Sequence, residues 1–236
     1  MKILAVESSS KIRSVALCEG VTGEVQAFHV LASIESVSER GGRFASLIDE
    51  VLSQASVNRS EVEEIAVGVG PGSAAGIRST LAFARGWEVA RGIPLTGISS
   101  VWAVAAQSQT EGIEGDTMVV LRGPLGKVYH ADFQISPSSI VERLPLALDD
   151  ISNLPDRLSS GCRVVGPDLA PLLAQISHSD GEACHEYKTS KISPMAVAVA
   201  RLAWDRVAGA IVPAEPLNLV TPQFVKAPPP REIPGL

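Results

Sequence analysis

One stretch near the middle of the first half constrains the fold most strongly, because it joins a strand, a glycine turn and a helix. Residues 65–69 (IAVGV) form an apolar run typical of a central strand. The turn Gly70-Pro71-Gly72-Ser73 follows, and Ser73 is a good helix N-cap since its hydroxyl can accept a free amide of the first turn. A helix is predicted over 73–91 and a further strand over 94–98. This strand–helix–strand order is typical of an α/β sheet.

The same turn is a candidate anion site. Gly70 and Gly72 allow a sharp bend and leave room for a close approach, and Ser73 opens the helix N-terminus. A strand, a glycine turn and a helix N-terminus can together hold a phosphate or carboxylate. The same geometry also serves only to end a strand and begin a helix, so both interpretations stay open.

The chain begins with further alternation of strands and a helix. Strands are predicted over 2–6, 14–18 and 23–31 as an antiparallel meander, followed by a helix over 43–55 and, later, a short helix over 101–107. The helix over 43–55 places apolar residues at i, i+3, i+4, i+7, i+8 and i+11, which makes it amphipathic. These positions are Phe44, Leu47, Ile48, Val51, Leu52 and Ala55.

The second half of the chain is less regular. The polar loop 108–115 is the best candidate for a lobe boundary. The elements expected after it are strands over 117–121, 127–133 and 163–165, a looser region over 135–160, and helices over 169–176 and 194–207 with Ser193 as cap and Pro194 in the first turn. The proline-rich tail from Ile211 is predicted to be extended and pinned across the surface.

Composition narrows the classes of function. A net charge of −6 argues against a large general nucleic-acid surface. No apolar run approaches the roughly 20 residues of a membrane span. Three cysteines without paired spacing indicate reduced thiols and a cytoplasmic protein.

The order of elements predicts two related α/β lobes. It is that of the ribonuclease-H-like lobes of the actin, Hsp70 and sugar-kinase superfamily, with the second lobe reduced. We expect an N-terminal lobe over 1–107, a smaller C-terminal lobe over 108–210 and an extended tail over 211–236.

Several segments resemble the bacterial TsaB (YeaZ) family. The run Gly68-Val69-Gly70-Pro71-Gly72-Ser73-Ala74-Ala75-Gly76-Ile77-Arg78 is similar to the family's GRGPGSFTG-(L/V)-R signature, although Phe-Thr is replaced by Ala74-Ala75. The N-terminal Ile3-Leu4-Ala5-Val6 with Ser14-Val15-Ala16-Leu17, and the later Gly92-Ile93-Pro94-Leu95, also fit. The resemblance is strong over 1–105 and patchy afterwards.

The resemblance implies a role in making N6-threonylcarbamoyladenosine at position 37 of tRNA. TsaB-like chains are the non-catalytic partner of the homologous transferase TsaD and work with the ATPase TsaE, so tRNA would be met indirectly. No cofactor or metal is implied for this subunit. A free homodimer acting as a binding module is a further alternative.

Residue types also favour a partner over an enzyme. No two of the four histidines stand four apart, so the His-x-x-x-His metal pair of TsaD-like transferases is absent from the sequence. Glu7-Ser8-Ser9-Ser10 occupies the place of the Asp-x-Gly-Thr phosphate hairpin and lacks its glycine. The rival hypothesis is an active ATP-dependent carbamoyl- or phosphotransferase, with Glu7 as the magnesium carboxylate. The candidate anion or nucleotide contacts are therefore Glu7, Gly70, Gly72 and Ser73.

The family's dimer contact is a helical bundle from the first two long helices of each partner. On this chain the resemblance implies an exposed stripe along the helices 43–55 and 73–91. The predicted interface residues are Arg43, Phe44, Leu47, Val51, Ile77, Arg78, Leu81 and Arg85.

Overall fold

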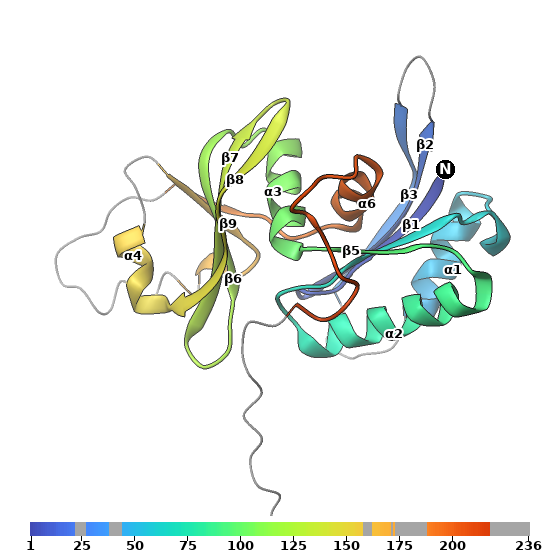
Figure 1. Ribbon diagram of the computed structural model, residues 1–236, viewed down its shortest axis with the longest axis horizontal. Helices are drawn as coiled ribbons and strands as arrows, with labels where there is room; N and C mark the ends of the chain where they lie inside the picture. Colours follow the sequence, from blue (N-terminus) through green and yellow to red (C-terminus); the bar gives the residue numbers. More distant parts are fainter. Residues whose placement is uncertain (22–26, 38–43, 158–161, 171, 173–187, 218–236) are drawn as a thin grey trace, which may run out of the picture.

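The computed structural model contains two β-sheets with helices between and outside them (Figure 1). It describes residues 1–21, 27–37, 44–157, 162–170, 172 and 188–217. The first sheet has the strand order β11-β5-β4-β1-β2-β3 and the second β10-β9-β6-β7-β8. This architecture confirms the predicted pair of ribonuclease-H-like α/β lobes.

The first sheet is built from a meander and a parallel unit. β1 (Lys2–Glu7) pairs antiparallel with β2 (Ile12–Val21), and β2 with β3 (Ala27–Val37). β1 also pairs parallel with β4 (Glu64–Gly68), and β4 with β5 (Leu95–Ile98). The short β11 (Ile211–Val212) adds antiparallel to β5. The strand–helix–strand unit predicted around Ser73 is thereby confirmed.

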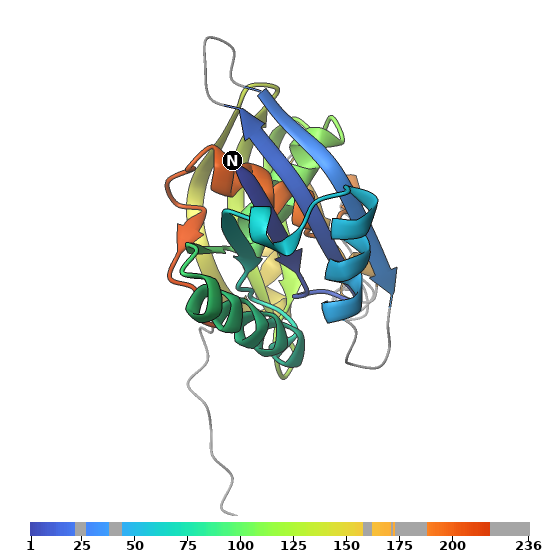
Figure 2. The same ribbon diagram turned by 90° about the vertical axis from the view of Figure 1, so that its right-hand side faces the viewer.

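Two helices cover one face of this sheet. α1 (Phe44–Gln54) and α2 (Ala74–Arg91) lie in front of the strands in Figure 2, and the short 3-10 helix Arg59–Glu61 follows α1. Ser73 caps α2 by accepting the amide of Gly76, and Gly92 ends it in the left-handed conformation at φ 66°. The amphipathic stripe of α1 is buried against the sheet, as its periodicity requires.

The second sheet is a three-stranded meander extended by two parallel strands. β6 (Gly115–Arg122), β7 (Lys127–Ser136) and β8 (Ser139–Asp150) pair antiparallel. β9 (Arg163–Gly166) pairs parallel with β6, and β10 (Lys188–Lys191) with β9. The 3-10 helix Ile151–Asn153 and α4 (Leu154–Arg157) follow β8.

The main core lies between the two sheets. α3 (Ser100–Thr110) and α6 (Ala196–Trp204) fill the space between them (Figure 1), and their small and branched side chains pack into one cluster with residues of both sheets. Trp102 on α3 meets the ring of Phe133 on β7 edge-on at 5.0 Å between centroids. The two lobes therefore share a continuous apolar core.

Two expectations for the second half differ from the structure, and a third lies largely beyond the residues that it describes. The region 135–160, predicted to be loose, contains the 12-residue strand β8, which lies at a sheet edge and therefore exposes much of its surface. The last helix begins at Ala196 with Met195 as cap, so Ser193 and Pro194 precede it. The helix predicted over 169–176 lies largely outside the described residues.

The predicted lobe boundaries also need revision. α6, assigned by sequence to the second lobe, returns to the first sheet, where the amide of Ala196 donates to the Ser14 hydroxyl on β2 at 2.8 Å. β11 then extends the first sheet at β5. The helix returns because the apolar back of the first sheet needs a cover that α1 and α2 do not provide, whereas β11 extends the edge of that sheet.

None of the helices in the described ranges is long and apolar enough to cross a membrane. Cys18 and Cys162 are free and buried, and burial raises the pKa of the Cys18 thiol to about 12. Cys184 lies outside the described residues.

Candidate functional site

The carboxyl ends of β1, β4 and β5 meet at one edge of the first sheet. The three strands are mutually parallel, so the residues that follow them are brought together there. Glu7 ends β1, the Gly70–Ser73 turn follows β4, and Ser100 follows β5 as the first residue of α3. Ligands of open α/β sheets bind at such an edge, which makes this the candidate site.

Glu7 is the buried centre of the edge. Its carboxylate accepts the amide of Ser9 at 2.5 Å and the hydroxyl of Ser100 at 2.9 Å, and the Ser100 oxygen in turn accepts the amide of Gly70 at 3.1 Å. Burial raises the pKa of Glu7 above its ordinary value, and these hydrogen bonds oppose the rise. Gly68 is required beside it, since a Cβ there would lie 1.8 Å from Glu7 Oε2.

The turn between β1 and β2 is packed directly on the N-terminus of α2. The amide of Ser73 donates to the carbonyl of Ser9 at 2.7 Å. A Cβ at Gly72 would lie 2.2 Å from that carbonyl oxygen, and a Cβ at Gly76 would lie 2.2 Å from the carbonyl oxygen of Ser8. The glycines of the signature thus let two backbones touch.

A second contact between this turn and α2 is made by hydroxyl groups. The hydroxyls of Ser8 and Thr80 form a hydrogen bond, and Thr80 also donates to the carbonyl of Gly76 at 2.7 Å. The structure therefore brings together all four predicted residues, Glu7, Gly70, Gly72 and Ser73. The Glu7 carboxylate and the Ser73 amide already form hydrogen bonds within the protein, and the Ser9 carbonyl fills the space beside Gly72.

The C-terminal segment crosses the same edge. After β11 the chain runs to Leu217, whose amide donates to the carbonyl of Val69 at 2.9 Å. Arg85 of α2 donates to the carbonyl of Ala214 at 3.2 Å. Residues 211–217 are pinned across this edge as predicted, but the chain bends at Ala214 and Glu215 and is not extended throughout; the rest of the tail lies outside the described residues.

The expected exposed apolar stripe on α1 and α2 is wrong for most of its members. Phe44, Val51, Ile77 and Leu81 are buried in the cluster beneath the two helices, and Leu47 is partly buried. Their side chains face their own sheet because a helix covering a sheet buries its most apolar side. Arg78 and Arg85 are exposed, as predicted. Arg43 lies outside the described residues.

The outward side of α2 consists of small residues, arginines and one large apolar side chain. Val89 is 85% exposed near its C-terminal end. The exposed positions are Ala74, Ala75, Arg78, Ser79, Ala82, Arg85, Gly86, Val89, Ala90 and Arg91. We call this set the α2 outer face.

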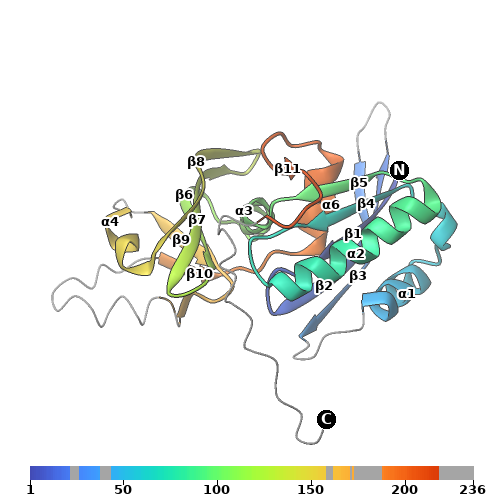
Figure 3. The same ribbon diagram turned by 60° about the horizontal axis from the view of Figure 1, so that its bottom comes forward.

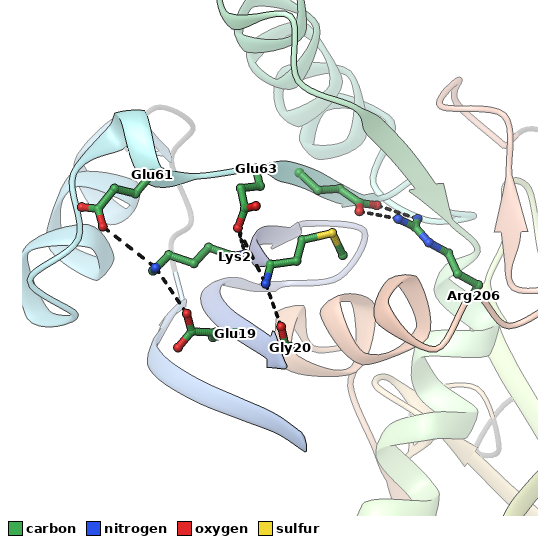
Figure 4. Close-up of polar contacts among 8 residues, drawn as sticks. Lys2, Glu19, Gly20, Glu61, Glu63 and Arg206 are labelled. Carbon is green, nitrogen blue, oxygen red and sulfur yellow. Dashed lines mark hydrogen bonds and ion pairs between the residues drawn. The ribbon is translucent and has the colours of Figure 1, made fainter. Parts of the chain in front are cut away.

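Sequence reasoning missed a charged pair that ties the C-terminal part of the chain to the first sheet (Figure 4). Glu64 at the start of β4 is buried. Two guanidinium nitrogens of Arg206 donate hydrogen bonds to its carboxylate at 2.6 and 2.8 Å. The hydroxyl of Thr96 donates to the same carboxylate at 2.7 Å. Arg206 lies 142 positions along the chain from Glu64, so no local pattern links them.

The second sheet contains two further buried polar groups that the sequence did not single out. Within the described residues, neither ring nitrogen of His130 nor Oδ1 of Asp132 has a hydrogen-bond partner. Burial lowers the pKa of His130 and raises that of Asp132. Among all residues that the structure describes, no group of three or more His, Cys, Asp or Glu side chains is placed to hold a metal ion.

Comparison with known proteins gives one family match and several relatives. Residues 41–161 match the family model described as TsaD, tRNA N6-adenosine threonylcarbamoyltransferase. The tRNA threonylcarbamoyladenosine biosynthesis protein TsaB of Escherichia coli K12 is 25% identical over 140 residues, which is 59% of this chain and 58% of that protein. The TsaB protein of Haemophilus influenzae is 30% identical over 105 residues, 44% of this chain and 42% of that protein. The matched region thus spans about half the length of these curated relatives.

A solved structure shares the whole fold. YeaZ from Pseudomonas aeruginosa superposes with a TM-score of 0.71 at 20% identity, covering 92% of this chain and 99% of that chain. The similarity extends across both lobes, so it includes the second half of the chain, where the sequence match is weak.

Proposed function

The chain belongs to the TsaB (YeaZ) family, and from that premise we propose that it is a non-catalytic subunit that binds and activates a TsaD-type threonylcarbamoyltransferase. The product of that complex would be N6-threonylcarbamoyladenosine at position 37 of tRNA. A TsaE-type ATPase would work in the same complex, tRNA would be met through the catalytic subunit, and the complex would be cytoplasmic.

One observation supports a non-catalytic role above others: the β1–β2 turn is closed onto α2. An ATPase of this superfamily needs backbone amides of that turn directed at a phosphate. Here the carbonyls of Ser8 and Ser9 lie against Gly76 and Gly72 instead, within 2.2 Å of where a Cβ would stand. A phosphate placed between turn and helix would have to separate these backbones.

The state of Glu7 supports the same conclusion. A magnesium carboxylate must present an oxygen to the ion and its water. Glu7 is fully buried, and each of its oxygens already accepts a protein hydrogen bond, from Ser9 and from Ser100. We assign the carboxylate the role of fixing the ends of β1 and β5 to each other.

We propose the α2 outer face as the contact with the catalytic subunit. Its alanines and Gly86 allow another helix to approach closely, and apart from the neighbouring backbone of α2 no heavy atom lies within 4 Å of where a Cβ of Gly86 would stand. Val89 offers an exposed apolar side chain at one end and Arg78 a charge at the other. When the catalytic subunit is absent, a second copy of this chain would be able to bind the same face and form a homodimer.

Reconstituted tRNA modification tests the proposal. The mixture holds a TsaD-type subunit, a TsaE-type ATPase, threonylcarbamoyl-adenylate synthase, ATP, threonine, bicarbonate and a tRNA reading A-starting codons. Modified adenosine that forms only when this chain is added is the expected result. Equal modification with and without the folded chain would refute the proposal.

A thermal-shift titration distinguishes the proposed non-catalytic subunit from the rival hypothesis, an ATP-dependent carbamoyl- or phosphotransferase. A ligand that binds only the folded state raises Tm. We expect Mg-ATP to leave the Tm of the isolated chain unchanged, whereas the Tm of an ATP-dependent transferase would rise with the logarithm of the ligand concentration above Kd.

A further inference from the structure

The hairpin between β6 and β7 ends in a tight turn with an unusual residue at its tip. The amide of Lys127 donates to the carbonyl of Pro124 at 3.0 Å, and the amide of Gly123 donates to the carbonyl of Lys127 at 2.9 Å. The two central residues, Leu125 and Gly126, have φ angles of 51° and 77°. Positive φ at both central positions is the mark of a type I′ turn.

Leucine is a poor residue for this position. The first central residue of a type I′ turn is normally Asn, Asp or Gly, because these tolerate the left-handed conformation. The Leu125 side chain is 95% exposed, so it contributes almost nothing to the core in return. A residue that opposes its own turn and packs on little within the chain indicates a contact with another molecule.

The position of the hairpin points to the occupant. Figures 1 and 3 place the β6–β7 tip on the same side of the molecule as the N-terminal half of α2, one from each lobe. The tip therefore shares a side of the molecule with the N-terminal half of α2, where we propose that the catalytic subunit binds. A partner seated on α2 would meet the hairpin as a second, separate contact.

The charges on this side suit a partner with carboxylates. Arg122 in the hairpin and Arg78 on α2 are both exposed, and neither forms an ion pair with any described residue. The chain as a whole has a net charge of −6, so unpaired arginines on one side are a local exception. An apolar tip beside a cation fits an apolar pocket with an acidic rim; a phosphate backbone would leave Leu125 without a partner.

We propose that Leu125 inserts into an apolar pocket of the TsaD-type catalytic subunit, with Arg122 pairing with a carboxylate at the rim of that pocket. This inference rests on the proposed function and adds a contact from the second lobe to it. Leu125 then acts as an anchor: its backbone is already fixed by the turn, so binding would order only the rotamers of one side chain.

Calorimetric titration of the full-length chain with the TsaD-type subunit of the same organism tests the proposal. Leu125→Asn is the informative variant, since Asn suits the turn and lacks the apolar side chain. We expect Kd to rise at least tenfold while Tm stays the same or increases. Arg122→Ala should raise Kd less and flatten its dependence on salt.

Val141→Thr is the matched control. Val141 is also an exposed apolar residue of the second lobe. It pairs with Gln134 close to the β7–β8 turn, which lies at the other end of β7 from the β6–β7 turn. We expect its Kd to stay within twofold of that of the unmodified chain.

The outcomes distinguish this inference from the function on which it rests. If the unmodified chain binds and Leu125→Asn binds within twofold of it, the anchor is refuted and the partner role stands. If the unmodified chain does not bind at all, both are refuted. A fall in the Tm of Leu125→Asn would refute the assignment of the turn. Binding of an unmodified tRNA transcript to the isolated chain that depends on Arg122 but not on Leu125 would reassign this side to RNA.

Discussion

Replacing Arg206 by alanine should destabilise the protein more than replacing an arginine whose acidic partner is exposed. The change removes both nitrogens that bind the Glu64 carboxylate, at 2.6 and 2.8 Å. Glu64 is only 1% exposed, so the charge left behind cannot reach water without moving β4. Arg206 also holds the chain between α6 and β11 against the first sheet, in a left-handed conformation at φ 50°.

The magnitude follows from how much of the pair is buried. Removing one partner of a fully buried ion pair costs about 3 to 5 kcal/mol. Here the arginine side chain is 52% exposed, and the Thr96 hydroxyl remains bonded to the carboxylate. We therefore expect a loss of about 2 to 3 kcal/mol, which is below the range for a fully buried pair. For an m value of about 3 kcal/mol/M, the urea midpoint would fall by about 0.7 to 1 M.

A double-mutant cycle with Glu64→Gln identifies the cause. Glutamine keeps the volume and removes the charge, so Arg206→Ala in that background should cost only about 1 kcal/mol or less. Arg59→Ala is the control, because its pair with Asp49 is exposed on both sides and should contribute less than about 1 kcal/mol. A loss below about 1 kcal/mol for Arg206→Ala alone, or an equal loss in both backgrounds, would refute the argument from burial.

Four further perturbations test the site and the proposed contact. Gly72→Ala should lower the free energy of unfolding by about 2 kcal/mol or more, measured in urea, since its Cβ would lie 2.2 Å from the Ser9 carbonyl oxygen and φ is 153°. Gly86→Ala should raise it by about 0.5 to 1 kcal/mol, because the site is open and helical. Glu7→Gln should gain stability relative to the unmodified chain as pH rises above about 4.5, followed by urea midpoints from pH 4.5 to 8. Ala82→Arg should leave Tm unchanged and weaken binding of the TsaD-type subunit at least tenfold by calorimetry.

The sign for Glu7 follows from its raised pKa. The folded state binds the proton more tightly than the unfolded state, so the contribution to stability is complete below the unfolded value. It is lost as pH rises through the folded one. A pH profile that Glu7→Gln leaves unchanged would contradict this. Equal effects of Gly72→Ala and Gly86→Ala would contradict the close backbone contact, and unweakened binding by Ala82→Arg would contradict the α2 outer face.

The sequence by itself determined the local elements of the first lobe. The stripe of α1, the Ser73 cap and the Gly92 stop each depend on residues within a few positions of one another. Hydrogen bonds to helix ends and the 3.6-residue period act over that same range, so most helices and strands of this half could be predicted within a few residues. The third strand, expected over 23–31, instead continues to Val37. The four residues at the strand ends could also be grouped, because parallel strands direct their carboxyl ends to one edge.

The tertiary structure decided what those residues face. Ile77 and Leu81 form a stripe that could equally cover a sheet or a partner, and only the presence of the first sheet beneath α2 assigns them to the core. The closure of Ser9 onto Gly72 and the capture of Glu64 by Arg206 join segments that are distant in the chain. No periodicity specifies such pairs: their free energy comes from burial and charge, and these exist only once the sheet and its covering helices have been assembled.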